Sequence, residues 1–134
     1  MTQHISAVTL VVPGYDEAIG FYVGKLGFRL IEDTVLSPRK RWVVVAPPGN
    51  SETGLLLAQA DSEEQNETIG NQSGGRVFLI LKTNDFDGDY ARFKQTGIEF
   101  LEEPRVEAYG KVVVFRDAFG NKWDLIEPLA NQPG

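Results

Sequence analysis

The sequence predicts an α+β fold made of two copies of one βαβββ module. Three observations predict it. The 134 residues suit one compact domain, the second half repeats the first, and each half combines one helical pattern with several β-rich runs. The repeat is clearest where residues 27–33 (GFRLIED) match residues 97–103 (GIEFLEE). We place the two modules at about residues 5–59 and 76–128.

The first module is expected to begin with a strand at residues 7–12, whose Val and Leu content favours β-structure. A helix follows, because Asp16 suits a helix N-terminus and apolar residues then recur at helical spacing as far as Leu26. Gly27 can adopt the left-handed conformation that ends a helix. Three further strands are expected, at residues 28–34, 41–46 and 54–59.

The second module repeats this order. Its first strand is expected at residues 77–81, and its helix is capped by Asn84 or Asp85 and ended by Gly97. Three further strands are expected, at residues 98–103, 111–115 and 122–127. A polar loop, residues 60–75, joins the modules and is either a solvated linker or a loop that folds over a pocket.

Composition excludes several classes of protein. The chain has no cysteine, which rules out disulfides, thiolate zinc sites and cysteine nucleophiles and fits a cytoplasmic location. The net charge of −6 argues against a nucleic-acid partner, because phosphate binding depends on Lys and Arg. No apolar stretch approaches the roughly 20 residues of a membrane span, and no signal peptide is expected, so we expect no membrane partner.

Two stretches resemble a known family. VTLVVPGYDEAIGFYVGKLGF (residues 8–28) is similar to the opening module of the glyoxalase/bleomycin-resistance/extradiol dioxygenase superfamily, also called the vicinal oxygen chelate superfamily. FRDAFGNKWDLIEP (residues 115–128) resembles its closing hairpin. The resemblance implies that each module forms a cupped mixed sheet, that the two sheets surround a cavity, and that the protein is a homodimer.

The resemblance also implies where a metal would bind. Active metalloenzymes of the family place His, Glu or Gln ligands on four strands. The matching positions here are Ala7, Leu56, Val77 (or Arg76, in a register shifted by one residue) and Asp124. Only Asp124 can bind a metal, whereas a divalent site generally needs about three protein ligands. We therefore expect no metal and no cofactor, and we lean against an enzyme. A displaced site built from His4, Asp124 and Glu127 is the alternative, but odd spacing places His4 and Glu127 on the opposite strand faces.

Five residues are candidates for ligand binding. A buried Asp124 needs a donor or a cation, which either a neighbouring side chain or a ligand amine, hydroxyl or amide supplies. Arg105, Glu107 and Tyr109 share a face if the segment is extended, and form either an ion-paired strand edge or the polar rim of a pocket. Trp42 is either a core or interface anchor or a platform for a planar ligand.

These observations favour a metal-free small-molecule binding protein of the glyoxalase/bleomycin-resistance type, with an unknown ligand. The alternative is a divalent-metal-dependent lyase, isomerase or dioxygenase of the same superfamily, and a third hypothesis is a purely structural dimer domain. The basic run Arg39-Lys40-Arg41 is either a solvated turn or a point of attraction for an anionic ligand.

Overall fold

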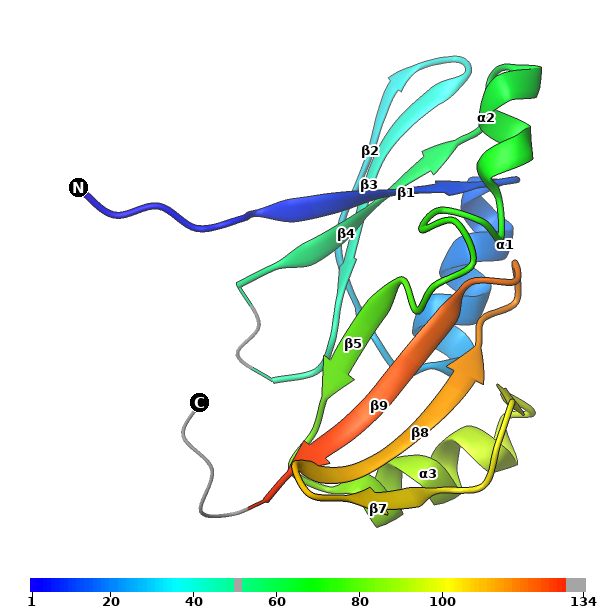
Figure 1. Ribbon diagram of the computed structural model, residues 1–134. Coiled ribbons are helices and arrows are strands. Elements are labelled where there is room, and N and C mark those ends of the chain that lie inside the picture. The colour runs from blue at the N-terminus through cyan, green and yellow to red at the C-terminus, as the bar shows by residue number, and fades with distance from the viewer. Residues whose placement is uncertain (50–51, 130–134) are drawn as a thin grey trace. The chain divides into compact units, whose positions relative to one another are not determined.

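Two mixed β-sheets, one in each half of the chain, carry the fold of this computed structural model, which describes residues 1–49 and 52–129 (Figure 1). They confirm the predicted α+β class. The chain divides into unit 1 (Met1–Ile69) and unit 2 (Gly70–Gly134), each with its own sheet. No helix in the described ranges is long and apolar enough to cross a membrane.

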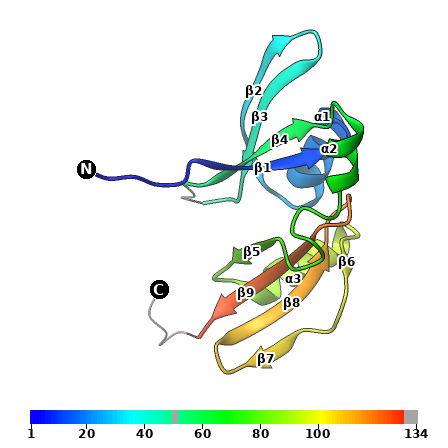
Figure 2. The same ribbon diagram turned by 45° about the horizontal axis from the view of Figure 1, so that its top comes forward.

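Unit 1 follows the order predicted for the first module. Its elements are β1 (Ala7–Val12), α1 (Tyr15–Ile19), the π-helical turn η1 (Gly20–Lys25), β2 (Arg29–Ser37), β3 (Lys40–Ala46), β4 (Gly54–Gln59) and α2 (Glu63–Thr68). The strands are arranged β1-β4-β3-β2, with β1 parallel to β4 and the other neighbours antiparallel. The long β2–β3 hairpin is the cyan pair of strands at the top of both ribbon views (Figures 1 and 2).

Alternation along the strands of unit 1 separates a buried face from a partly exposed face. The buried side chains on the first face are Leu10, Val12, Val43, Val45, Leu55 and Leu57. Helix α1 contacts β3 and β4, and the buried Tyr22 of η1 extends this core. The helical segment ends where predicted: Gly27 has a φ of 84° and the Phe28 N–H donates to the Tyr22 carbonyl at 2.8 Å.

Unit 2 repeats the topology. Its elements are β5 (Leu79–Lys82), α3 (Phe86–Gln95), β6 (Glu99–Phe100), β7 (Arg105–Glu107), β8 (Gly110–Arg116) and β9 (Lys122–Pro128). The strands are arranged β5-β9-β8-β6, with β5 parallel to β9 and β7 also paired with β8. Helix α3 covers one face, where Phe93 packs its ring against Phe115 at 5.5 Å between centroids. Trp123 stacks on Phe115 in the same core.

The strand expected at residues 98–103 is two short strands, β6 and β7. Between them, the Glu102 carboxylate accepts the Val114 N–H at 3.2 Å, so a side chain replaces a backbone acceptor of the ladder. Pro104 follows and has no N–H to donate to β8. Both strands pair with β8 on either side of this interruption.

The connection predicted as a polar loop contains the helix α2. The Ser62 hydroxyl accepts the Gln65 N–H at 3.1 Å, and the Gln65 side chain accepts the Asp61 N–H at 3.0 Å. Ser62 and Gln65 have the spacing of a capping box, a signal that the polar composition of the segment obscured. Unit 2 then begins at Gly70, whose φ of 78° and closeness to the Phe119 carbonyl leave no room for a side chain.

Candidate ligand site around Asp124

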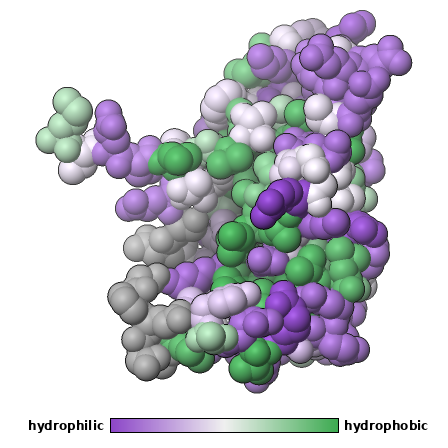
Figure 3. Space-filling view, in the orientation of Figure 1, coloured by the Kyte–Doolittle hydropathy of each residue, from purple (hydrophilic) through white to green (hydrophobic). Residues whose placement is uncertain are grey.

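Asp124 lies on the face of the unit 2 sheet that α3 leaves uncovered. In β9 its neighbours Trp123 and Leu125 are buried in the core, so strand alternation turns Asp124 to the opposite face. Across the sheet it pairs with Ile80 of β5 and Val114 of β8. The carboxylate is therefore set among apolar side chains, and the space-filling view shows hydrophobic and hydrophilic residues side by side over this part of unit 2 (Figure 3).

The Asp124 carboxylate makes no hydrogen bond or ion pair with any residue in the described part of the chain. Burial raises its pKa above the ordinary value of 3.8; the positive charge of Arg105 opposes this rise, and the negative charge of Glu102 adds to it. Burial without a partner destabilises the charged form, so this carboxylate would gain from a hydrogen-bond donor or a cation brought to it.

Arg105 is a cation that could pair with Asp124, but its guanidinium already donates hydrogen bonds to two glutamates. Its Nε donates to Glu102 Oε2 at 2.8 Å and its Nη1 donates to Glu107 Oε1 at 2.6 Å. These two hydrogen bonds raise the pKa of the guanidinium above its ordinary value, with a smaller contribution from Tyr109. One guanidinium thus holds two carboxylates, and with Asp124 the cluster carries an excess of negative charge.

The structure brings together four of the five predicted ligand-binding residues. Arg105 and Glu107 lie two apart on β7, Tyr109 lies in the two-residue turn that follows, and Arg105 acts electrostatically on Asp124. Trp42 belongs to unit 1. It lies on β3 opposite Thr34 and is 41% exposed, so it is not a core anchor of that unit.

The positions that resemble metal-ligand positions do not fit a divalent ion. In unit 1, Ala7 lies two residues from Thr9, which pairs with Leu56, so Ala7 and Leu56 share a sheet face and offer only hydrocarbon. In unit 2, Val77 precedes β5, and Ile80 is the residue that pairs with Asp124. Within residues 1–49 and 52–129, no group of three or more His, Asp or Glu side chains comes together to hold a metal.

The displaced metal site considered from the sequence finds no support in the geometry. Glu127 accepts the Phe86 N–H at 2.8 Å and thereby caps the start of α3. His4 precedes β1 and is exposed. Glu127 is thus bound to the helix, and strand alternation places it on the face of β9 opposite Asp124.

The sequence analysis did not identify two residues, Glu102 and Asp117, whose side chains hold neighbouring groups of unit 2 in place. Glu102 fixes both Arg105 and the Val114 N–H, and its only sequence signal is an opposite charge three residues before Arg105. Asp117, 5% exposed, accepts hydrogen bonds from the Phe119 and Asn121 N–H groups and from the Asn121 and Trp123 side chains. Asp at the start of a turn commonly accepts hydrogen bonds from the backbone that follows it, and here Asp117 anchors the turn that ends in Gly120-Asn121 before β9.

Comparison with known proteins adds independent information. The family model described as Glyoxalase/Bleomycin resistance protein/Dioxygenase superfamily matches residues 4–125. An uncharacterized protein of Shewanella frigidimarina (strain NCIMB 400) is 54% identical over 134 residues, which cover 99% of each chain. The crystal structure of UcmS2 is 30% identical with a TM-score of 0.81, covering 94% of this chain and 98% of that one. TnmS3, an antibiotic binding protein from Streptomyces sp. CB03234, is 29% identical with a TM-score of 0.75, covering 95% and 97%.

Proposed function

The chain belongs to the Glyoxalase/Bleomycin resistance protein/Dioxygenase superfamily, and from this membership we propose that it is a small-molecule binding protein that works without a metal ion. It sequesters its ligand and leaves it chemically unchanged. The observation that carries the proposal is the Asp124 carboxylate, which lies between the apolar Ile80 and Val114 and has no partner among the described residues. The antibiotic binding of TnmS3, a structural neighbour at 29% identity, supports the same class of function.

The surroundings of Asp124 indicate the chemistry of the ligand. Ile80 and Val114 offer apolar contact on both sides of the carboxylate. The pair Glu102 and Glu107 outweighs the charge of Arg105, so the cluster attracts cations and repels anions. We therefore expect a largely apolar molecule that carries an amine, or a hydroxyl or amide that donates to Asp124.

Binding of an amine should depend on pH through Asp124. Only the ionised carboxylate forms a charge-assisted hydrogen bond with an ammonium group, and the pKa of Asp124 in the free protein is raised by burial. Affinity should therefore increase as the pH rises through this raised pKa and level off above it. Binding at lower pH releases the proton that Asp124 holds.

A panel of amine-bearing aromatic compounds and their neutral analogues tests this function. Thermal shift finds ligands, because a molecule that binds the folded state raises the melting temperature, and calorimetry then measures Kd. We expect Asp124→Asn to weaken binding of an amine by about tenfold or more, as lost charge-assisted hydrogen bonds are worth about 1.5–3 kcal/mol. Glu103→Gln is the matched control, because it removes one negative charge from an exposed residue of the same unit. A panel without hits would favour a structural domain, and unchanged affinity in Asp124→Asn would exclude this site.

Metal content separates the binding protein from the metalloenzyme alternative. We expect protein purified without chelators to contain no stoichiometric divalent ion by mass spectrometry. A stoichiometric ion that disappears in Asp124→Ala would instead support a metal-dependent lyase, isomerase or dioxygenase.

We also propose that this function is carried out by a homodimer in the cytoplasm. The absence of cysteine supports a reducing compartment. The exposed apolar side chains of β2 support association with a second copy.

A further inference from the structure

Arg105 lies on the same face of the unit 2 sheet as Asp124 and close to it. In β7 it pairs with Val112 of β8, and Val112 in turn pairs with Ile126 of β9, so the three side chains form a row across this face. Ile126 lies two residues from Asp124 on β9, so strand alternation gives them the same face. The charge of Arg105 lowers the pKa of Asp124, which shows that the two groups interact through space.

Other cations share this face, but they do not act on Asp124 in the same way. Strand register places three of them there, namely Lys82, Arg116 and Lys122. The charges that change the pKa of Asp124 are those of Arg105 and Glu102. Arg105 is therefore the cation whose position decides whether the Asp124 carboxylate is occupied.

Two glutamates hold the guanidinium of Arg105. Its Nε donates to Glu102 Oε2 at 2.8 Å, and its Nη1 donates to Glu107 Oε1 at 2.6 Å. Glu102 is itself fixed, because the same oxygen accepts the Val114 N–H at 3.2 Å. In the described part of the chain the ion pairs of Arg105 are those with the two glutamates, and Asp124 is left without a partner.

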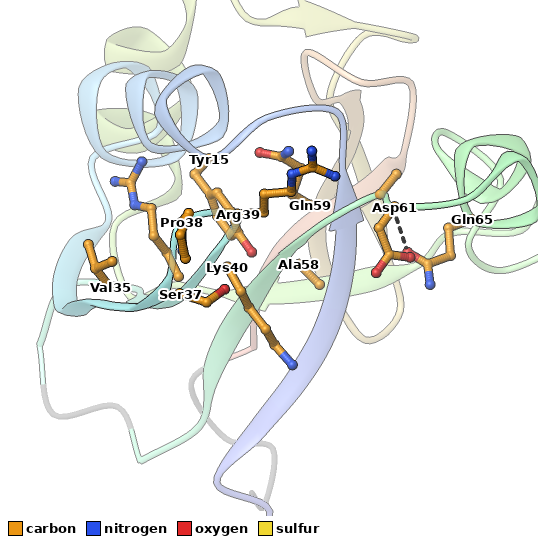
Figure 4. A pocket seen from close by; sticks show the side chains of 12 residues that line it. Tyr15, Val35, Ser37, Pro38, Arg39, Lys40, Ala58, Gln59, Asp61 and Gln65 are labelled. Carbon is orange, nitrogen blue, oxygen red and sulfur yellow. Dashed lines mark hydrogen bonds between the residues drawn. The ribbon is translucent and has the colours of Figure 1, made fainter.

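Unit 1 also contains an arginine bound by two carboxylates, and it lacks this further carboxylate. Arg41 donates to Asp16 at 2.9 Å and to Asp33 at 2.7 Å, and the charges that raise its pKa are those of the same two residues. It lines a pocket of about 890 Å³, in which Asp61 lies on the side away from the hairpin tip (Figure 4). Arg41 is matched by its two partners, whereas Arg105 also acts on a third carboxylate.

The arrangement around Arg105 can exchange partners. The side chains of Arg105, Glu102 and Glu107 are all partly exposed, and ion pairs of that kind contribute little to stability. Asp124 is partly buried, where the attraction between opposite charges is stronger than in water. Without the two glutamates, the guanidinium would therefore pair with Asp124.

We propose that Glu102 and Glu107 are positioning residues that hold Arg105 off Asp124 and thereby keep the carboxylate free for a cationic ligand. Arg105 is then an internal competitor of the ligand, because its guanidinium would bind the same carboxylate oxygens as a ligand ammonium group. The inference rests on the proposed function for the role of Asp124, but the position of Arg105 can be measured without a ligand.

The pKa of the Asp124 carboxyl, followed by carbon-13 NMR in a pH titration of the full chain, tests the proposal. In the wild type it should lie above 3.8, because burial is the largest influence on it. In Glu102→Gln/Glu107→Gln it should fall below 3.8, because Arg105 then donates hydrogen bonds to the ionised carboxylate. Loss of the Glu102 charge alone cannot cause this crossing, because burial raises the pKa by more than the charge of Arg105 lowers it.

Two further variants identify the cation and control for net charge. Addition of Arg105→Gln to the double variant should return the pKa of Asp124 to above 3.8. The matched control Asp87→Asn/Glu103→Gln removes two negative charges from exposed residues of the same unit and should also leave the pKa above 3.8. The glutamine at position 102 keeps an acceptor for the Val114 N–H, so the strand pairing is preserved.

Binding of tryptamine, an aromatic amine, measures the consequence for the ligand site. Calorimetry should show the Kd rising by about tenfold or more in Glu102→Gln/Glu107→Gln. The Kd should return to within about threefold of the wild-type value when Arg105→Gln is added. Asp87→Asn/Glu103→Gln should change it by less than about twofold.

Two results would overturn the proposal. A pKa that stays above 3.8 in Glu102→Gln/Glu107→Gln would show that Arg105 does not move to Asp124. A pKa that stays below 3.8 after addition of Arg105→Gln would assign the pairing to another cation of this face, such as Lys82. If the pKa crosses 3.8 and recovers as expected but tryptamine does not bind the wild type, the role of the two glutamates is supported and the proposed ligand class is contradicted.

Discussion

Two aspartates of the closing hairpin show how surroundings determine the role of a carboxylate. Asp117 is buried, but four hydrogen-bond donors compensate it, so it stabilises the turn before β9. Asp124 lies on β9 with apolar neighbours and no partner in the described residues. Hydrogen bonds within the turn explain the burial of Asp117, whereas the role that we propose for Asp124 depends on a bound ligand.

A substitution of Asp124 should therefore stabilise the protein. Its folded-state pKa is raised above 3.8, so folding favours the protonated carboxyl. The stability this group contributes is present at low pH and lost as the pH rises through the folded pKa. In thermal unfolding, Asp124→Asn should melt at a modestly higher temperature than the wild type near neutral pH, and the difference should shrink as the pH falls toward 4.

The matched variant Glu103→Gln should show no such convergence, because Glu103 is exposed. A lower melting temperature for Asp124→Asn at neutral pH would contradict the interpretation, since it would reveal a stabilising partner of the carboxylate. Destabilising polar groups of this kind are found at functional sites, where stability is traded for binding.

At this scale, the sequence predicted which residues lie near one another better than it predicted their hydrogen-bond partners. Strand alternation placed Arg105 and Glu107 together correctly. It left the partner of Asp124 open, and the structure shows that Arg105, whose charge acts on Asp124, is engaged by Glu102 and Glu107. Which of several carboxylates pairs with one guanidinium depends on distances in the folded structure. The spacing of residues along the chain does not specify those distances.

Among the elements, α3 shows the clearest agreement between sequence signals and structure. Asp85 was one of the two predicted caps, and its carboxylate accepts the Gly88 N–H at 3.2 Å. Glu127 of β9 accepts the N–H of Phe86, the first residue of the helix. One cap is local and predictable, and the other comes from a distant strand and is visible only in the fold.

Removal of the local cap should destabilise unit 2. We expect Asp85→Ala to lower the free energy of unfolding by about 1 kcal/mol, the usual cost of losing an N-cap carboxylate. Urea denaturation followed by circular dichroism measures the change. Glu103→Ala, an exposed residue outside the helix, should alter stability by less than about 0.5 kcal/mol. An Asp85→Ala variant as stable as this control would show that Glu127 alone suffices to cap α3.

Elements that depend on a single side chain were harder to predict. Helix α2 was hidden in a polar segment, because its capping residues Ser62 and Gln65 also suit a loop. The break between β6 and β7 depends on Glu102 reaching Val114, a contact across strands. The regular strands and both long helical segments were predicted because burial imposes periodicity on their sequences.

On the scale of the whole molecule, the internal repeat predicted the most. Both units have the same sheet plan, in which the first and last strands of the module pair in parallel at one edge of a mixed sheet. The repeat predicts this plan because each module must bury the same pattern of side chains. The repeat does not predict which surfaces remain exposed, and the exposed surfaces of the two units differ.

The exposed β2 strand leads to the last prediction, that the protein forms a homodimer. Every residue of β2 is exposed and the strand is an edge of its sheet, yet it carries Leu30, Ile31, Val35 and Leu36, with Val35 71% exposed. Apolar edge strands are liable to associate unless another chain covers them. Light scattering at micromolar concentration should give twice the chain mass of 14.8 kDa. Ile31→Lys/Leu36→Lys should be monomeric, while Val106→Lys, at a more exposed apolar residue of β7, should remain dimeric. A monomeric wild type would contradict the homodimer, and a dimeric Ile31→Lys/Leu36→Lys would show that its interface lies away from β2.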